Sequence, residues 1–133
     1  MAIPSGSGSE VLRNFAINAN TGGAARVDFG GTTGTGSART SQNTTGVTAV
    51  PANVIITVLT VGITASATIS SMYGAVDWQG SGADINIFKQ YNLADNTTFI
   101  FNDKLVLREG DIFKIYTSGS CDIWGSFIYQ DWT

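Results

Sequence analysis

The sequence has no histidine and only one cysteine, and both shortages limit its chemistry. Without histidine among its 133 residues, neither Ser-His-Asp nor Cys-His catalysis is possible, and His-containing metal sites are excluded. The single cysteine, Cys121, cannot form an intramolecular disulfide, so the fold must depend on packing. We expect a protein that is not an enzyme and that holds no cofactor and no metal ion.

Charged residues are scarce as well and make up 13% of the sequence, about half the usual share. The net charge of −3 disfavours nucleic acid as a partner, because binding to phosphates requires clustered Lys and Arg. The longest apolar stretch, residues 53–69, is interrupted by Thr, Ser and Gly and is too short for a transmembrane helix. Residues 1–10 lack the basic region and apolar run of a signal peptide. We expect a soluble protein made in the cytoplasm, with neither nucleic acid nor a membrane as partner.

Small and β-branched residues dominate the rest of the sequence, and their pattern predicts strands. Segments rich in Val, Ile, Thr and aromatic residues alternate with clusters of turn residues at short, regular spacing. This pattern is typical of an all-β protein, and we expect an antiparallel β-sandwich or jelly roll of about eight to nine short strands. The segments are 11–17, 24–29, 53–61, 63–71, 73–78, 84–91, 97–101, 104–107, 111–117 and 122–130. Residues 11–133 are expected to form one domain, preceded by an extended arm of residues 1–10.

Three local features carry sharper expectations. Residues 30–46 contain no large apolar side chain, so they are expected to form a long exposed Gly/Thr-rich loop. Gly62 is expected to bend the strand that contains it, and residues 108–111 to form a tight hairpin in which Gly110 has a positive φ. In the last strand, Trp124 alternates with Ile123, so one of these two faces must point outward or into a partner.

Carboxylates and aromatic rings are the remaining candidates for chemistry. The pairs Glu109 with Asp111 and Asp77 with Asp84 could in principle hydrolyse glycosides, but acidic residues beside a glycine are ordinary turn residues. The same interpretation is favoured over calcium binding for four aspartates at predicted loop edges: Asp95, Asp103, Asp111 and Asp122. A saccharide platform is a further possibility, formed by tryptophans: Trp78, Trp124 or Trp132.

The two ends of the chain resemble a known family. The segments 1–13 (MAIPSGSGSEVLR), 98–107 (TFIFNDKLVL), 110–116 (GDIFKIY) and 129–133 (YQDWT) are similar to small virion structural proteins of tailed phages, especially marine and cyanobacterial ones. The resemblance does not extend to residues 18–96. It implies a β-sandwich displayed on a virion, either as a decoration (cement) protein on the capsid or as a tail, neck or fibre subunit.

The resemblance also implies partners, namely other copies of the chain, commonly in a homotrimer, and the major capsid protein or tail proteins. The small-residue arm is expected to dock on a neighbour, because an extended segment can add backbone hydrogen bonds to an exposed sheet edge. Trp132, near the end of the sequence, is expected to pack on a neighbouring subunit. The expected assembly residues are Ala2, Ile3, Pro4, Val11, Trp124, Tyr129 and Trp132.

Overall fold

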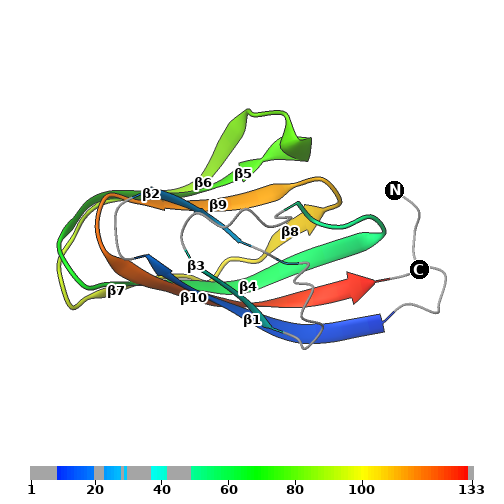
Figure 1. Ribbon diagram of the computed structural model, residues 1–133, viewed down its shortest axis with the longest axis horizontal. Helices are drawn as coiled ribbons and strands as arrows, with labels where there is room; N and C mark the ends of the chain where they lie inside the picture. The colour runs from blue at the N-terminus through cyan, green and yellow to red at the C-terminus, as the bar shows by residue number, and fades with distance from the viewer. Residues whose placement is uncertain (1–8, 20–22, 28, 30–36, 42–48, 132–133) are drawn as a thin grey trace.

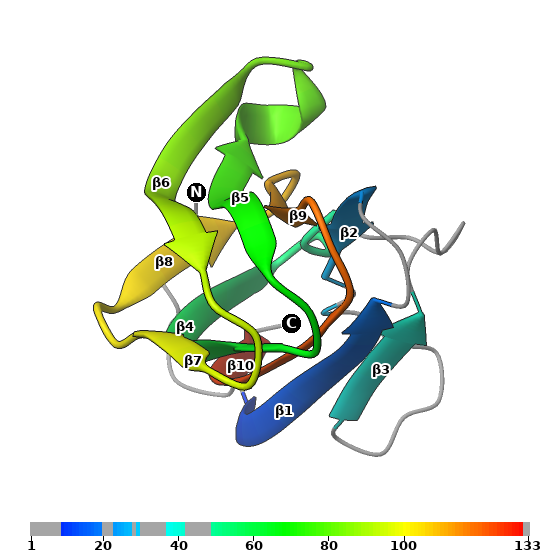
Figure 2. The same cartoon turned by 90° about the vertical axis from the view of Figure 1, so that its left-hand side faces the viewer.

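The computed structural model describes residues 9–19, 23–27, 29, 37–41 and 49–131, and these form an all-β sandwich of two sheets (Figures 1 and 2). The described residues contain ten strands and one short 3-10 helix. The strands are β1 (Ser9–Ala19), β2 (Gly23–Arg26), β3 (Ser37–Ser41), β4 (Val54–Ala65), β5 (Ile69–Asp77), β6 (Asp84–Leu93), β7 (Thr98–Phe101), β8 (Leu105–Arg108), β9 (Ile112–Thr117) and β10 (Cys121–Asp131), and η1 is Trp78–Gly80. Within the described ranges, no helix has the length and apolarity needed to cross a membrane.

The chain crosses repeatedly between the two sheets. In sheet A the strand order is β3-β1-β10-β4, and both β7 and β8 pair with the far edge of β4. In sheet B the order is β2-β9-β5-β6. Every strand pair is antiparallel except β1 with β3, which is parallel. Figure 1 shows the two layers stacked, with β5 and β6 diverging from the sandwich near η1.

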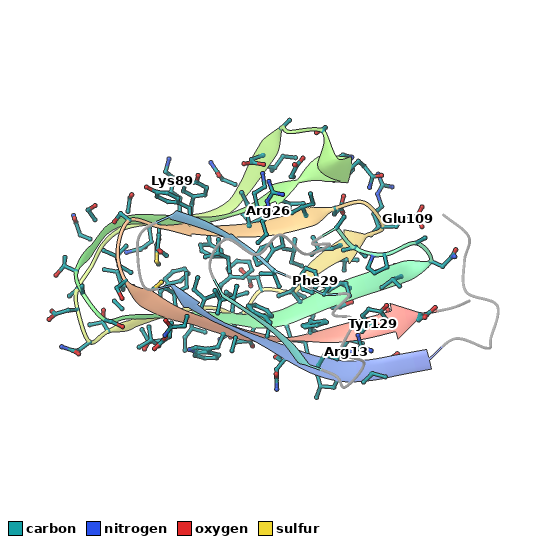
Figure 3. The ribbon with its side chains drawn as sticks, viewed as in Figure 1. Arg13, Arg26, Phe29, Lys89, Glu109 and Tyr129 are labelled. Carbon is teal, nitrogen blue, oxygen red and sulfur yellow. The ribbon has the colours of Figure 1, made fainter. Side chains whose placement is uncertain are left out.

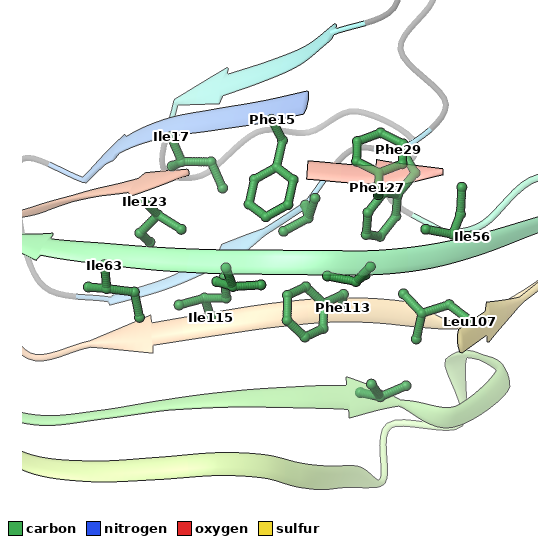
Figure 4. Packing of buried hydrophobic residues seen from close by; sticks show 14 of the residues in the cluster. Phe15, Ile17, Phe29, Ile56, Ile63, Leu107, Phe113, Ile115, Ile123 and Phe127 are labelled. Carbon is green, nitrogen blue, oxygen red and sulfur yellow. The ribbon is translucent and has the colours of Figure 1, made fainter. Parts of the chain in front are cut away.

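The core lies between the layers and is made by alternate residues of the facing strands (Figure 4). Along β10 the buried residues are Cys121, Ile123, Gly125 and Phe127, while the residues between them are less buried. Three phenylalanines meet in the core: Phe29 contacts Phe127 edge to face at 4.9 Å between ring centroids, and Phe15 lies 6.2 Å from Phe127. Each fully buried side chain of this size contributes about 1.5–3 kcal/mol of transfer free energy.

Three glycines lie directly opposite aromatic residues on neighbouring strands. Phe15 pairs with Gly125, Phe88 with Gly74, and Trp124 with Gly62. A Cβ on any of these glycines would stand 2.2–2.5 Å from a ring atom of its partner, so each glycine makes the room that its aromatic ring occupies. The expected bend at Gly62 was therefore wrong: β4 continues through it as a single strand.

Two further expectations are corrected. Residues 37–41, which fall within the expected loop 30–46, form β3 and pair with β1, because backbone pairing at a sheet edge needs no large side chain. The turn at 108–111 is not a hairpin, since β8 pairs with β4 and β9 pairs with strands of sheet B. It carries the chain from one layer to the other, although Gly110 does have the predicted positive φ, at 88°. The arm, expected at residues 1–10, lies outside the described residues apart from Ser9 and Glu10, which belong to β1.

Candidate interaction surface

The outer face of sheet A is built from cross-strand rows. Residues that are paired across β1, β10, β4 and then β7 or β8 share the same face, because side chains alternate along each strand. Three neighbouring rows form the centre of this face, and together we call them the central patch. Its rows are Leu12-Ile128-Thr57-Val106, then Asn14-Ser126-Thr60, then Ala16-Trp124-Gly62-Ile100.

The central patch contains no charged residue. Two rows are mainly apolar, and the row between them carries only hydroxyl and amide side chains. The apolar residues are well exposed at the ends of the rows: Leu12 is 68%, Val106 63% and Ile100 50% exposed. Four of the molecule's seven exposed large hydrophobic residues in the described chain therefore lie on this one face, which is unusual for a surface that stays in water.

Across β1, β10, β4, β7 and β8, the charged residues that the structure describes on this face lie in the rows that flank the central patch, and β3 adds Arg39 opposite Ala16 at the edge of the sheet. On one side Glu10 accepts a hydrogen bond of 3.1 Å from the Gln130 amide, and on the other Asp122 accepts one of 2.7 Å from Asn18. Arg108 completes the first of these rows. The face thus has an apolar and hydroxyl centre with a charged rim, which is how protein interfaces are usually arranged.

Trp124 is the largest side chain of the central patch. It is 39% exposed, its six-membered ring lies over Gly62, and its Nε1–H donates to the Thr64 hydroxyl over 3.4 Å. Gly74 and Gly125 hold their aromatic partners inside the sandwich, whereas Gly62 holds Trp124 on the outside. The sequence prediction that one face of this strand points away from the core is confirmed by the exposure of Trp124.

The other expected assembly residues do not share this face. Val11 and Tyr129 pair with each other but alternate with the outward residues, so they lie on the inner side of sheet A near one end. There the Arg13 guanidinium stacks on the Tyr129 ring at 3.9 Å, beside the ends of β1 and β10 (Figure 3). The remaining expected residues, Ala2, Ile3, Pro4 and Trp132, lie outside the described residues.

The outer face of sheet B has a different character. Tyr73 and Tyr116 stack across β5 and β9 with ring centroids 5.0 Å apart, and Lys89 pairs with Tyr73 on the next strand. Lys114, in the middle of the sheet, forms ion pairs of 3.0 Å with Asp84 and 3.7 Å with Asp77. Arg26 lies across from it on β2, and Figure 3 shows Arg26 and Lys89 on the upper layer. Charges are therefore distributed over the centre of this sheet.

The carboxylate pairs considered for catalysis have structural partners. Asp111 is 3% exposed and accepts backbone hydrogen bonds from Gln79 and Arg108, both of 3.1 Å. Glu109 accepts one of 2.9 Å from the backbone of Asn53. Asp77 and Asp84 are joined by Lys114, and Asp77 also accepts from the Gly82 amide. Both pairs are occupied in holding loops and strands together.

Metal-binding groups and thiol chemistry receive no support from the described part of the chain. There, no group of three or more His, Cys, Asp and Glu side chains is placed to hold a metal ion. Cys121 is buried, and its burial raises the pKa of the thiol above the ordinary value. A thiol in this state is a poor nucleophile at neutral pH.

The sequence prediction missed most of the central patch. Leu12, Ile100, Val106 and Ile128 lie in segments that were predicted as strands, and their outward alternation was visible in the sequence. What the sequence does not contain is the pairing of β10 with β1 on one side and β4 on the other, which places these residues in shared rows.

Comparison with known proteins does not assign the chain to a family, since no family model matches it and no curated protein matches it.

Proposed function

We propose that this chain is a non-enzymatic structural subunit of a phage virion, a decoration protein that binds the outside of the head through its central patch. The observation that carries the proposal is the charge-free centre of this patch between charged rims. Covering it with a partner removes apolar surface from water without stripping water from a charge, and burying an unpaired charge would oppose association strongly.

The strand order supports this role. We infer that the sandwich is a jelly roll, because β1, β10, β4 and the β7 and β8 edge alternate along the chain with β2, β9, β5 and β6 in the other sheet. In this description β3 is an addition to the edge of β1. Jelly rolls are common in capsid domains and lectins, so the architecture suits a particle protein but does not by itself select one. The resemblance of the chain ends to virion proteins favours the particle protein in this proposal.

Self-association is part of the same proposal. Copies of the chain form a homo-oligomer, a trimer in keeping with the resemblance, and the particle partner is the major capsid protein. Light scattering coupled to size-exclusion chromatography measures the number of chains in the homo-oligomer. A molar mass of two or more chains in solution supports the oligomer, and a monomer at all accessible concentrations contradicts it.

The experiment that tests the function is co-sedimentation of the purified protein with capsids that lack it. We expect saturable binding to these capsids and none to tails isolated from the same virions. Binding to tails alone would overturn the decoration role in favour of a tail, neck or fibre subunit. Immunogold labelling of intact virions gives an independent location, with label on the head expected.

A further inference from the structure

Three loops meet at one end of the sandwich, beyond the rim row of the central patch that ends in Arg108. They are residues 50–53 before β4, residues 78–82 between β5 and β6, and residues 108–111 between β8 and β9. Two backbone hydrogen bonds of 2.9 Å join the first loop to the third: Gly110 N–H donates to Val50 O, and Val50 N–H donates to Asp111 O. Figure 3 labels Glu109 at this end.

Asp111 joins the second loop to the third. Its Oδ1 accepts hydrogen bonds from the Gln79 backbone and the Gln79 side-chain amide, both of 3.1 Å, and its Oδ2 accepts one from the Arg108 backbone. The Gln79 amide also donates to the Glu109 carbonyl over 2.8 Å. A buried carboxylate with this many donors fixes the loops relative to one another.

Left-handed backbone is concentrated in the same loops. Of the seven described residues with positive φ, five lie here: Asn53, Gln79, Gly80, Gly82 and Gly110. Asn53 and Gln79 are not glycines, and such conformations persist only where surrounding contacts hold them. In both residues a backbone N–H donates to a carboxylate, from Asn53 to Glu109 and from Gln79 to Asp111.

The fixed loops display an exposed aromatic ring beside a cation. Trp78 is 50% exposed, and the Arg108 guanidinium lies 4.9 Å from the centre of its ring. No hydrogen bond or ion pair engages this guanidinium within the described part of the chain, so its donors remain available for a ligand. Glu109, next in sequence, is exposed and uses one carboxylate oxygen for Asn53.

We propose that Trp78, Arg108 and Glu109 form a saccharide-binding site. A sugar ring has an apolar C–H face, which suits the Trp78 ring, and a rim of hydroxyl groups that both donate and accept. The Arg108 guanidinium supplies donors in a fork, and the Glu109 carboxylate accepts, so adjacent sugar hydroxyls can bind both side chains. The ligand is a neutral saccharide, because the charges of Arg108 and Glu109 offset each other in the site.

This inference goes beyond the decoration role and does not depend on it. The central patch and the saccharide site contain different tryptophans, Trp124 and Trp78. A failure of capsid binding therefore leaves the sugar test unaffected, and the reverse also holds.

The test uses the indole N–H signals of the three tryptophans in a two-dimensional NMR spectrum of the full chain. Trp78→Phe and Trp124→Phe variants assign the signals. Glucose, galactose, mannose and N-acetylglucosamine are then added separately to tens of millimolar. We expect at least one sugar to shift the Trp78 signal in a saturable manner while the Trp124 signal stays in place.

Two variants decide whether the proposed contacts are responsible. Trp78→Ala lacks the reporting indole, so binding to it is followed through the sugar's own signals in saturation-transfer spectra, and these should show none. Arg108→Ala should weaken binding about tenfold, corresponding to one charge-assisted contact of about 1.4 kcal/mol. Arg26→Ala, which removes an exposed arginine from sheet B, is the matched control and should bind as the unaltered protein does. The proposal is overturned if no sugar shifts the Trp78 signal, if a different tryptophan responds in its place, or if Arg108→Ala binds unchanged.

Discussion

The two outer faces of this sandwich are made from the same alternating strands but carry opposite arrangements of charge. The centre of sheet A's outer face has apolar, hydroxyl and amide side chains, with charges at its rims. The centre of sheet B's outer face has Lys114 bound to two aspartates, with a tyrosine pair and Lys89 beside it. A face that remains in water gains from charges, whereas a face that is covered loses by them. This difference is the reason why we propose that sheet A, and not sheet B, is covered by a partner.

The largest expected effect comes from placing charge in the central patch. The double variant Leu12→Lys and Val106→Lys puts an ammonium at each end of one apolar row, where both positions are largely exposed in the free chain. We expect folding to be retained and association with capsids to fall at least a hundredfold, because an unpaired charge buried at an interface costs about 3–5 kcal/mol. Co-sedimentation measures the loss.

The matched control for this variant is Ile85→Lys. Ile85 is 52% exposed and lies on β6 in sheet B, so the substitution adds one ammonium outside the central patch and matches either single variant, Leu12→Lys or Val106→Lys, in charge. Association should be unaffected. Equal losses from both changes would mean that total charge, and not the place of the charge, governs binding.

A second comparison separates the inner and outer glycine–aromatic pairs. In Gly125→Ala the new Cβ would stand 2.4 Å from the Thr60 carbonyl and 2.5 Å from the Phe15 ring, which has no space to move within the core. We expect a loss of about 3 kcal/mol in the free energy of unfolding, at the upper end of overpacking effects. In Gly62→Ala the obstructing Trp124 can turn toward solvent, so the loss should stay below about 1 kcal/mol.

Urea denaturation of the two variants measures both values. Equal losses would show that Trp124 is held as firmly on its outer face as Phe15 is in the core. In that event the association of Gly62→Ala should also be compared with that of the unaltered protein, because the substitution displaces the largest ring of the central patch.

A further prediction concerns the turn that links the two sheets. Gly110 has a φ of 88°, and a β-branched residue there is strained, so Gly110→Val should lower the free energy of unfolding by about 1–3 kcal/mol. Gly82→Ala is a useful companion, since its φ of 82° is similar and nothing lies near its missing Cβ. Thermal melting of both variants measures the cost of the positive φ. Gln79 adds crowding in Gly110→Val, and no neighbour does so in Gly82→Ala. An unchanged melting temperature in Gly110→Val would contradict this account of the turn.

Much of this architecture can be predicted from local patterns in the sequence. Alternation along β10 predicts that Trp124 and Phe127 lie on opposite faces, and the glycine in the 108–111 turn predicts its positive φ. Pairing between distant strands cannot be predicted in this way. It decides that β8 joins β4, that β3 joins β1, and that Gly62 faces Trp124 instead of bending its strand.

The candidate site depends on this long-range information even more. Trp124 was predicted as an assembly residue from its alternation alone, but its neighbours Ile100 and Ala16 come from strands far away in the sequence. Val11 and Tyr129 were also predicted as assembly residues. They lie on the inner side of sheet A, because they pair with each other and alternate with the outward residues of β1 and β10.

The most direct test of the covered face is covalent surface labelling of the protein, alone and bound to capsids that lack it, followed by mass spectrometry. We expect binding to protect Leu12, Val106 and Trp124 from labelling, while Tyr73 and Tyr116 on sheet B are labelled equally in both states. Protection of the tyrosines with continued labelling of Trp124 would contradict this proposal.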